Sequence, residues 1–137
     1  MDRYSFDLYV EEPSANASVT AERLRIVIES IPSGLLLVNA RGEIVLVNRQ
    51  AEIMFGHSRE ALIGKKMEIL LPERYRKNHP NLQHAFMEQP SSRSMGTGRD
   101  LFALRADGNE FPVEVGLNPV KSEEGIYVVA TIVDVVA

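Results

Sequence analysis

The segment from Gly34 to Gly56, GLLLVNARGEIVLVNRQAEIMFG, constrains the fold more than any other part of the sequence. Residues 35–38 and 44–47 are short apolar runs, and the turn-forming sequence NARGE between them predicts a β-hairpin whose strands are buried on both faces. A short helix is expected directly afterwards, with Asn48 as its N-cap and Gly56 as its left-handed stop. Its inward positions, spaced i, i+3 and i+4, are Ala51, Met54 and Phe55.

Length and charge restrict the class of protein. A chain of 137 residues with 45% hydrophobic and 25% charged residues is expected to form a single globular domain around one core. It has no apolar run of membrane-spanning length and begins with an acidic, interrupted segment that is not a signal peptide, so we expect a cytoplasmic protein without membrane insertion. The net charge of −4 argues against nucleic acid as a partner.

The N-terminal part divides into an arm and a helix. Residues 1–19 are expected to be an arm or linker, and residues 4–10, YSFDLYV, either dock on the domain or on a second copy, or are disordered. The domain proper is expected over residues 20–137, beginning with a helix capped by Thr20 and ended by Pro32. Leu24, Val27, Ile28 and Ile31 form one stripe on this helix, which covers an edge of its own sheet or pairs with the same helix of another subunit.

The middle of the chain reads as short helices over a sheet. SREALIG is expected to be a one-turn helix capped by Ser58 and closed by Gly64, and a further helical segment starts near Pro72 and is divided at Pro80. Residues 89–98, QPSSRSMGTG, are expected to be a loop.

Three strands follow this helical part. They are expected at residues 101–104, at residues 111–117, which alternate cleanly and are ended by Pro119 and the turn KSEEG, and at residues 126–133, which are buried on both sides. With the opening hairpin they give an α+β fold, a five-stranded antiparallel sheet with short helices over one face.

A roof of short, broken helices over a sheet is suited to enclosing a cavity. We expect its walls to come from Ile53, Met54, Leu70, Leu82 and Phe86 on the helical side and from Phe102, Val115 and Leu117 on the sheet. Whether Leu101 or Phe102 faces inward is open, because the register of that strand is not readable from the sequence.

Over residues 21–136 the chain resembles the PAS domain family of sensory and dimerisation modules. The resemblance is carried by IPSGLLLVNARGEIVLVNRQAEIMFGHSREALIGK, LLPERYRKNH, LRADGNEFPVEV and the closing IVDV. It implies a homodimer that binds a small ligand or none, and an output domain, such as a histidine kinase, cyclic-dinucleotide enzyme or transcriptional regulator, in the same chain or on a partner protein. Asp134 matches the acid with which the last strand of such domains leads to the output, while Val136 stands where a threonine is common.

The resemblance also bears on cofactors. The light sensors of the family that form a flavin-cysteinyl adduct need a cysteine, and the chain has none. The haem-binding oxygen sensors of the family carry an axial histidine in a segment like PERYRKNH, which implies His79 as the iron ligand and Arg99 as the residue that hydrogen-bonds bound gas. The alternative is a histidine that caps a helix in a domain without haem, and Pro80 directly after His79 favours that alternative.

Three functions therefore stand beside one another. The first is a non-catalytic sensory and dimerisation module of a two-component or similar signal-transduction protein, with Leu24, Val27 and Ile28 on its dimer helix. The second is a haem gas sensor. The third, a small enzyme, has no nucleophile, metal or phosphate motif in its favour.

Overall fold

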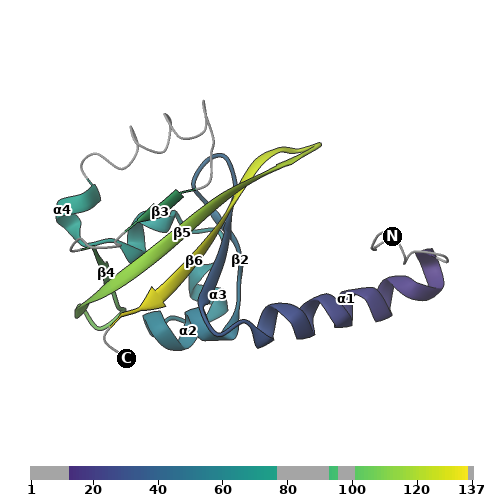
Figure 1. Cartoon of the computed structure of the whole chain (residues 1–137), viewed down its shortest axis with the longest axis horizontal. Helices are drawn as coiled ribbons and strands as arrows, with labels where there is room; N and C mark the ends of the chain where they lie inside the picture. The colour runs from purple at the N-terminus through teal and green to yellow at the C-terminus, as the bar shows by residue number, and fades with distance from the viewer. Residues whose placement is uncertain (1–12, 77–92, 96–100, 136–137) are drawn as a thin grey trace. The chain divides into compact units, whose positions relative to one another are not determined.

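The computed structural model describes residues 13–76, 93–95 and 101–135, and it divides into two compact units, residues 1–30 and 31–137. The first unit contains the helix α1, Pro13–Ser30 (Figure 1). This helix begins at Pro13, so the prediction of a linker up to a cap at Thr20 is wrong for residues 13–19: proline suits the first helical position, and Thr20 lies inside the helix. Residues 1–12, including the predicted arm 4–10, lie outside the described residues.

The second unit is an antiparallel sheet with short helices. Its strands are β1 (Gly34–Val38), β2 (Ile44–Val47), β3 (Arg93–Met95), β4 (Phe102–Leu104), β5 (Glu110–Ser122) and β6 (Gly125–Asp134). The sheet order is β2-β1-β6-β5-β3, and β4 also pairs with β5. Because β3 and β4 pair with different parts of β5, they share one position, and the five-position antiparallel sheet predicted from the sequence is confirmed.

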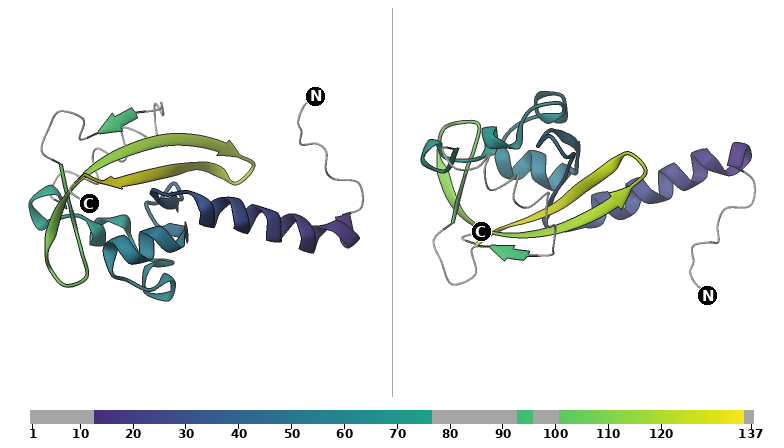
Figure 2. Two further views of the ribbon diagram at one scale, coloured as in Figure 1. Left: turned by 60° about the horizontal axis from the view of Figure 1, so that its bottom comes forward. Right: turned by 90° about the horizontal axis from the view of Figure 1, so that it is seen from above.

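The helices of this unit are short, with four to seven residues each. They are α2 (Arg49–Phe55), α3 (Arg59–Leu62), the 3₁₀ turn η2 (Met67–Leu70) and α4 (Glu73–Arg76). Figure 2 shows them on one side of the β5–β6 hairpin, as the sequence predicts. The predicted caps of α2 are also confirmed: the Asn48 side chain accepts a hydrogen bond from the Ala51 N–H, and Gly56 is left-handed, with φ 76°.

The core lies between these helices and the sheet. It is built from apolar side chains contributed by β1, β2, α2, α3, η2, β4, β5 and β6: Leu36, Val38, Ile44, Val47, Ala51, Met54, Phe55, Leu62, Leu70, Ala103, Phe111, Val113, Ala130 and Ile132. Alternate residues of the strands supply it, as strand geometry requires. The expectation that β2 and β6 are buried on both faces is wrong, because Val45 and Val133 are exposed.

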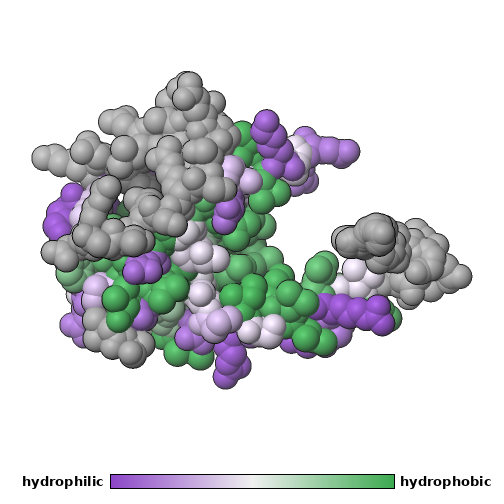
Figure 3. All heavy atoms as spheres, viewed as in Figure 1, coloured by the Kyte–Doolittle hydropathy of each residue, from purple (hydrophilic) through white to green (hydrophobic). Residues whose placement is uncertain are grey.

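In the space-filling view, hydrophobic residues gather over the strands on the face turned to the viewer (Figure 3).

Two further strand predictions need correction. Residues 93–95 form β3 inside the segment predicted to be a loop, because they pair with residues 115–117 of β5. β5 does not end at Pro119 but continues to Ser122, and β6 begins already at Gly125. Among the described residues, the strand segments beyond Asn118 and before Val128 pair only with each other, so the β5–β6 hairpin extends past its neighbouring strands (Figure 2).

Candidate functional site

Asp134, the residue that the PAS resemblance links to signal output, lies at the end of β6 and is paired. A guanidinium nitrogen of Arg105, Nη2, lies 3.1 Å from Oδ2 of Asp134. The two side chains are 32% (Arg105) and 17% (Asp134) exposed, so the ion pair is partly withdrawn from solvent. Partial burial makes the loss of one partner more costly than at an exposed pair.

Arg105 reaches two further parts of the unit. Its Nη1 donates a hydrogen bond to the carbonyl oxygen of Met54, near the C-terminus of α2. Its guanidinium carbon lies 3.8 Å from the centre of the Phe111 ring, a cation–π contact. That ring packs edge-to-face on Phe55 at 5.6 Å between centroids. Arg105 therefore joins the end of α2, the aromatic core and the end of the last strand.

Backbone bonds hold the same elements together. The Ala106 N–H donates to the Phe55 carbonyl at 2.8 Å, so the turn after β4 caps the end of α2. The Val135 N–H donates to the Pro112 carbonyl at 3.1 Å and keeps the end of the last strand on β5. Arg105 is not among the site residues predicted from the sequence. The sequence shows only that a basic residue stands just before the turn ADGN, and it does not show which residues that side chain contacts.

At the other end of α2, Asn48 is fully buried and bridges two elements. Its Oδ1 accepts hydrogen bonds from the N–H groups of Ala51 and Leu35, both at 2.9 Å, and its Nδ2 donates to the Ser33 carbonyl at 3.0 Å. One side chain thus caps α2 and fixes the entry to β1. The Asn48 side chain thereby holds the backbone at Ser33 and Leu35, where the chain enters β1.

The residues predicted to line a cavity divide into three groups. Met54 and Leu70 are buried in the core, and Val115 and Leu117 are half-buried against it. Leu82 and Phe86 lie outside the described residues. That these side chains line a ligand cavity stays a prediction.

Two cavity predictions are wrong. Ile53 is 63% exposed, because Ala51, Met54 and Phe55 take the inward positions of α2 and leave residue 53 on the opposite side. Phe102 does not join the core: Leu101 and Ala103 pack there, and the half-buried Phe102 ring lies beside Arg74 of α4 instead. The open choice at residues 101 and 102 is thereby decided for Leu101.

His79 and Arg99, the residues that would serve a haem, lie outside the described residues. The helix α4 precedes His79 in the sequence, and contacts of Arg74 with β5 and β4 hold it in place. Arg74 Nη1 lies 2.7 Å from Oε2 of Glu110, and the Arg74 guanidinium lies 5.6 Å from the Phe102 ring centre. The hydrogen bond from Arg74 lowers the pKa of the Glu110 carboxyl below its usual value.

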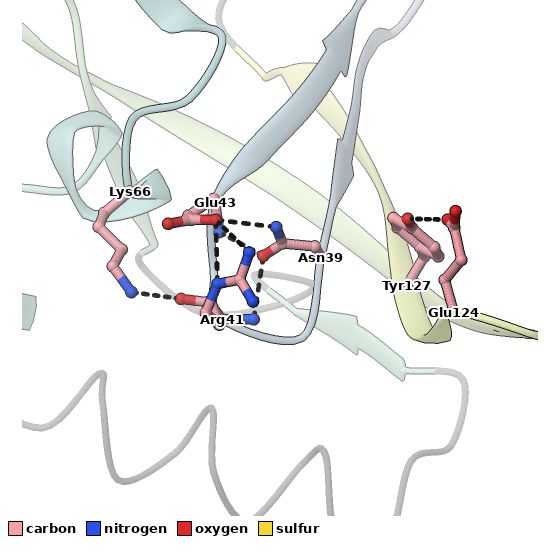
Figure 4. A network of polar contacts seen from close by, with 6 residues as sticks. All are labelled: Asn39, Arg41, Glu43, Lys66, Glu124 and Tyr127. Atoms are coloured by element: carbon pink, nitrogen blue, oxygen red, sulfur yellow. Dashed lines mark hydrogen bonds and ion pairs between the residues drawn. The ribbon is translucent and has the colours of Figure 1, made fainter.

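The β1–β2 turn carries a polar network on the surface (Figure 4). Asn39 Nδ2 donates to Oε1 of Glu43 at 2.9 Å, Arg41 pairs with the same oxygen, and Lys66 donates to the Arg41 carbonyl. The Asn39 amide is the main reason why the pKa of Glu43 is lowered. These contacts fix a tight turn, and we assign them a structural role.

Residues 13–76, 93–95 and 101–135 contain no group of three or more His, Cys, Asp or Glu side chains placed to hold a metal ion. Within the same ranges no helix combines the length and apolar character needed to cross a membrane.

Comparison with known proteins identifies relatives over most of the chain. The family model described as the PAS fold matches residues 22–135. The sensor protein FixL of Bradyrhizobium diazoefficiens is 29% identical over 117 residues, which are 85% of this chain and 23% of that protein. The oxygen sensor protein DosP of Escherichia coli is 30% identical over 101 residues, 74% of this chain and 13% of that protein. The chain thus spans less than a quarter of either relative.

Solved structures agree with the sheet and helices described above. The PAS domain of an HTR-like protein from Haloarcula marismortui superposes with a TM-score of 0.75 at 20% identity, covering 89% of this chain and 97% of that one. At this identity the likeness concerns the fold.

Proposed function

The chain belongs to the PAS family, and we propose that it is the sensory and dimerisation input module of a cytosolic signal-transduction protein. In this proposal it regulates an output domain, such as a histidine kinase, a cyclic-dinucleotide enzyme or a transcriptional regulator, in the same chain or on a partner. The domain itself carries out no catalysis. Its relation to FixL and DosP, whose names describe sensors, supports the sensory role.

The observation that carries the proposal is the contact between Arg105 and Asp134. A sensor needs a connection between its core and the end that leads to the output. Arg105 supplies one, because its guanidinium contacts Met54, Phe111 and Asp134 together. A change in the position of α2 would thus alter the restraint on the last strand. The inner face, with Leu101, Val115 and Leu117 half-buried, is where a small ligand would act on this arrangement.

For the dimer we propose the apolar stripe of α1. Leu24 and Val27 are each 58% exposed in the single chain, and Ile28 lies beside them on the same stripe. A second copy offers an identical stripe, so two helices would cover each other by self-complementary packing. An isolated helix of this length gains most of its stability from such packing rather than from its propensity.

The test is the oligomeric state of matched variants. Leu24→Glu places a charge on the stripe, whereas Ile26→Glu places the same charge on the opposite side of α1, at a residue of similar exposure, 55%. We expect the wild type and Ile26→Glu to sediment as dimers and Leu24→Glu as a monomer. If Leu24→Glu sediments like the wild type, α1 is not the dimer helix.

A second candidate function is oxygen sensing through haem. It is favoured by the match to the oxygen sensor DosP and by the donor chemistry of His79 and Arg99. A neutral imidazole is a common axial ligand of haem iron, and a guanidinium can donate hydrogen bonds to a bound gas. Half-buried Leu101, Val115 and Leu117 are apolar, as the surroundings of a porphyrin ring should be. When bound, haem would supply the iron for reversible gas binding.

This candidate is tested by absorption spectroscopy of the protein as purified and after incubation with haemin. Haem bound through His79 gives a sharp Soret band that shifts on reduction and with carbon monoxide, and His79→Ala loses the band. His57→Ala serves as the control and should keep it. A featureless spectrum under both conditions excludes haem and leaves the ligand to be sought by mass spectrometry, without affecting the dimer experiment.

A further inference from the structure

The β4–β5 hairpin has an ion pair on each side of its turn. Arg105 directly follows β4 and pairs with Asp134, while Glu110 begins β5 and pairs with Arg74 on α4. Leu104 is the register partner of Glu110, and the Arg105 N–H donates to the Asn109 carbonyl at 2.8 Å. The two ion pairs are thus held by the two ends of one short turn.

We propose that this hairpin is a mechanical link that couples α4 to the end of the last strand. The inference deepens the proposed function, since it takes the end of β6 as the output side and α4 as part of the sensing side. Arg74 and Glu110 then act as positioning residues. A displacement of α4 reaches Asp134 through the hairpin without passing through the inner face of the sheet.

The α4 side of the link is fixed by several contacts. Besides its ion pair with Glu110, the Arg74 guanidinium lies 5.6 Å from the ring centre of Phe102 on β4 and 4.8 Å from that of Tyr75. Arg76 Nε donates to the Leu71 carbonyl at 2.9 Å and ties the end of α4 to the residue before Pro72. A movement of α4 is therefore transmitted to both strands of the hairpin.

The output side is reached within two residues of Glu110. Pro112 accepts the hydrogen bond from the Val135 N–H at 3.1 Å, and Arg105 holds Asp134 from the other strand. Both strands of the hairpin thus contact the last residues of the sheet. A tilt of the hairpin would change the Pro112–Val135 and Arg105–Asp134 contacts together.

Hydrogen bonds within the turn between the two ion pairs stabilise it, so we expect the turn to move as one rigid body. The Gly108 N–H donates to the Arg105 carbonyl at 3.0 Å, and the Asn109 N–H donates to Oδ1 of Asp107 at 2.9 Å. Gly108 has φ 91°, a conformation that favours glycine. Internal bonds of this kind keep the distance between Arg105 and Glu110 constant.

Amide hydrogen exchange tests the link, because local opening can be followed residue by residue. In Arg74→Ala we expect the amide of Val135 to exchange roughly two- to fivefold faster, the range that a partly exposed ion pair gives. Arg74→Lys, which keeps the charge, should restore most of the protection. The amides of Leu36 and Val38 in the core of β1 serve as internal reference, since a general loss of stability would accelerate them as well.

The matched control is Arg41→Ala, which removes an exposed ion pair with Glu43 elsewhere in the same unit, at 3.2 Å. It should leave the exchange of Val135 unchanged. A double variant with Glu110→Gln should add little to Arg74→Ala, because both remove one interaction. If Arg74→Ala changes exchange only around residues 73–76 and 110–112, the link is refuted. That outcome involves neither haem nor dimerisation, so it is distinguishable from a failure of the proposed function.

Discussion

Arg105 and Asp134 stand 29 residues apart in the sequence and meet in an ion pair of 3.1 Å at the end of the last strand. The same guanidinium also bonds the Met54 carbonyl and covers the Phe111 ring. Arg105 is thus the residue through which three elements of the domain depend on one another.

Arg105→Gln should destabilise the fold by about 1–3 kcal/mol, because it leaves the mostly buried Asp134 carboxylate without this charge partner. Urea unfolding followed by circular dichroism measures the change. Arg25→Gln is the control, because the side chains of Arg25 and Glu22 are 60% and 54% exposed, and it should leave the free energy of unfolding almost unchanged. Equal losses in the two variants would show that Arg105 contributes no more than a surface charge.

Asn48→Ala should cost about 2–4 kcal/mol, more than an ordinary helix cap. It removes the cap of α2 and also leaves the Leu35 N–H and the Ser33 carbonyl without the amide bonds that they have here. Ser58→Ala, which removes only the exposed cap of α3, should cost about 1 kcal/mol. Chemical denaturation of both variants gives the comparison. A loss at Asn48 no larger than that at Ser58 contradicts its bridging role.

Gly116→Ala should destabilise the sheet by about 1–2 kcal/mol, because an added Cβ would lie 2.9 Å from Oγ1 of Thr131, its partner on β6. The double variant Gly116→Ala/Thr131→Ala removes the opposing atom and should recover that loss. Thermal unfolding of the wild type, both single variants and the double variant completes the cycle. Strictly additive effects would show that the two positions do not clash.

Glu43→Gln should change the dependence of stability on pH. Because the pKa of Glu43 is lowered in the fold, chiefly by Asn39, its carboxylate stabilises the native state at neutral pH, and the contribution fades as the pH falls below the unfolded value near 4.5. The melting temperature of the wild type should therefore exceed that of the variant at neutral pH, and the two should converge as the pH falls through the lowered pKa of Glu43 in the folded state. Glu123→Gln, at the exposed β5–β6 turn, is the control. A difference that grows toward acid pH would contradict the assignment.

The features that the sequence predicted well are local ones. The β1–β2 hairpin, the Asn48 cap and the Gly56 stop all follow from residues within a few positions of one another. The alternation at residues 111–117 likewise identified the inward face of β5. Local patterns of this kind determine backbone conformation almost independently of the remaining fold.

The features that were missed depend on distant partners. Residues 93–95 carry no strand pattern and become a strand only through pairing with residues 115–117. Arg105 donates a hydrogen bond to the Met54 carbonyl, 51 positions earlier in the chain, and no local sequence pattern predicts this contact. The apolar character of Ile53 favours an inward position, but the short helix α2 buries only the side that carries Ala51, Met54 and Phe55. The parts of the site that matter for coupling are thus those that depend on tertiary structure.

The length of the β5–β6 hairpin has one more consequence. Beyond Asn118 and before Val128, each strand has an outer edge that no other described strand covers. Bare edges invite pairing with another molecule and growth into aggregates. Lys121, Glu123 and Glu124 are exposed at the tip, where their charges and solvation oppose such growth. We expect apolar residues at these three positions to increase the tendency of the protein to aggregate through this hairpin.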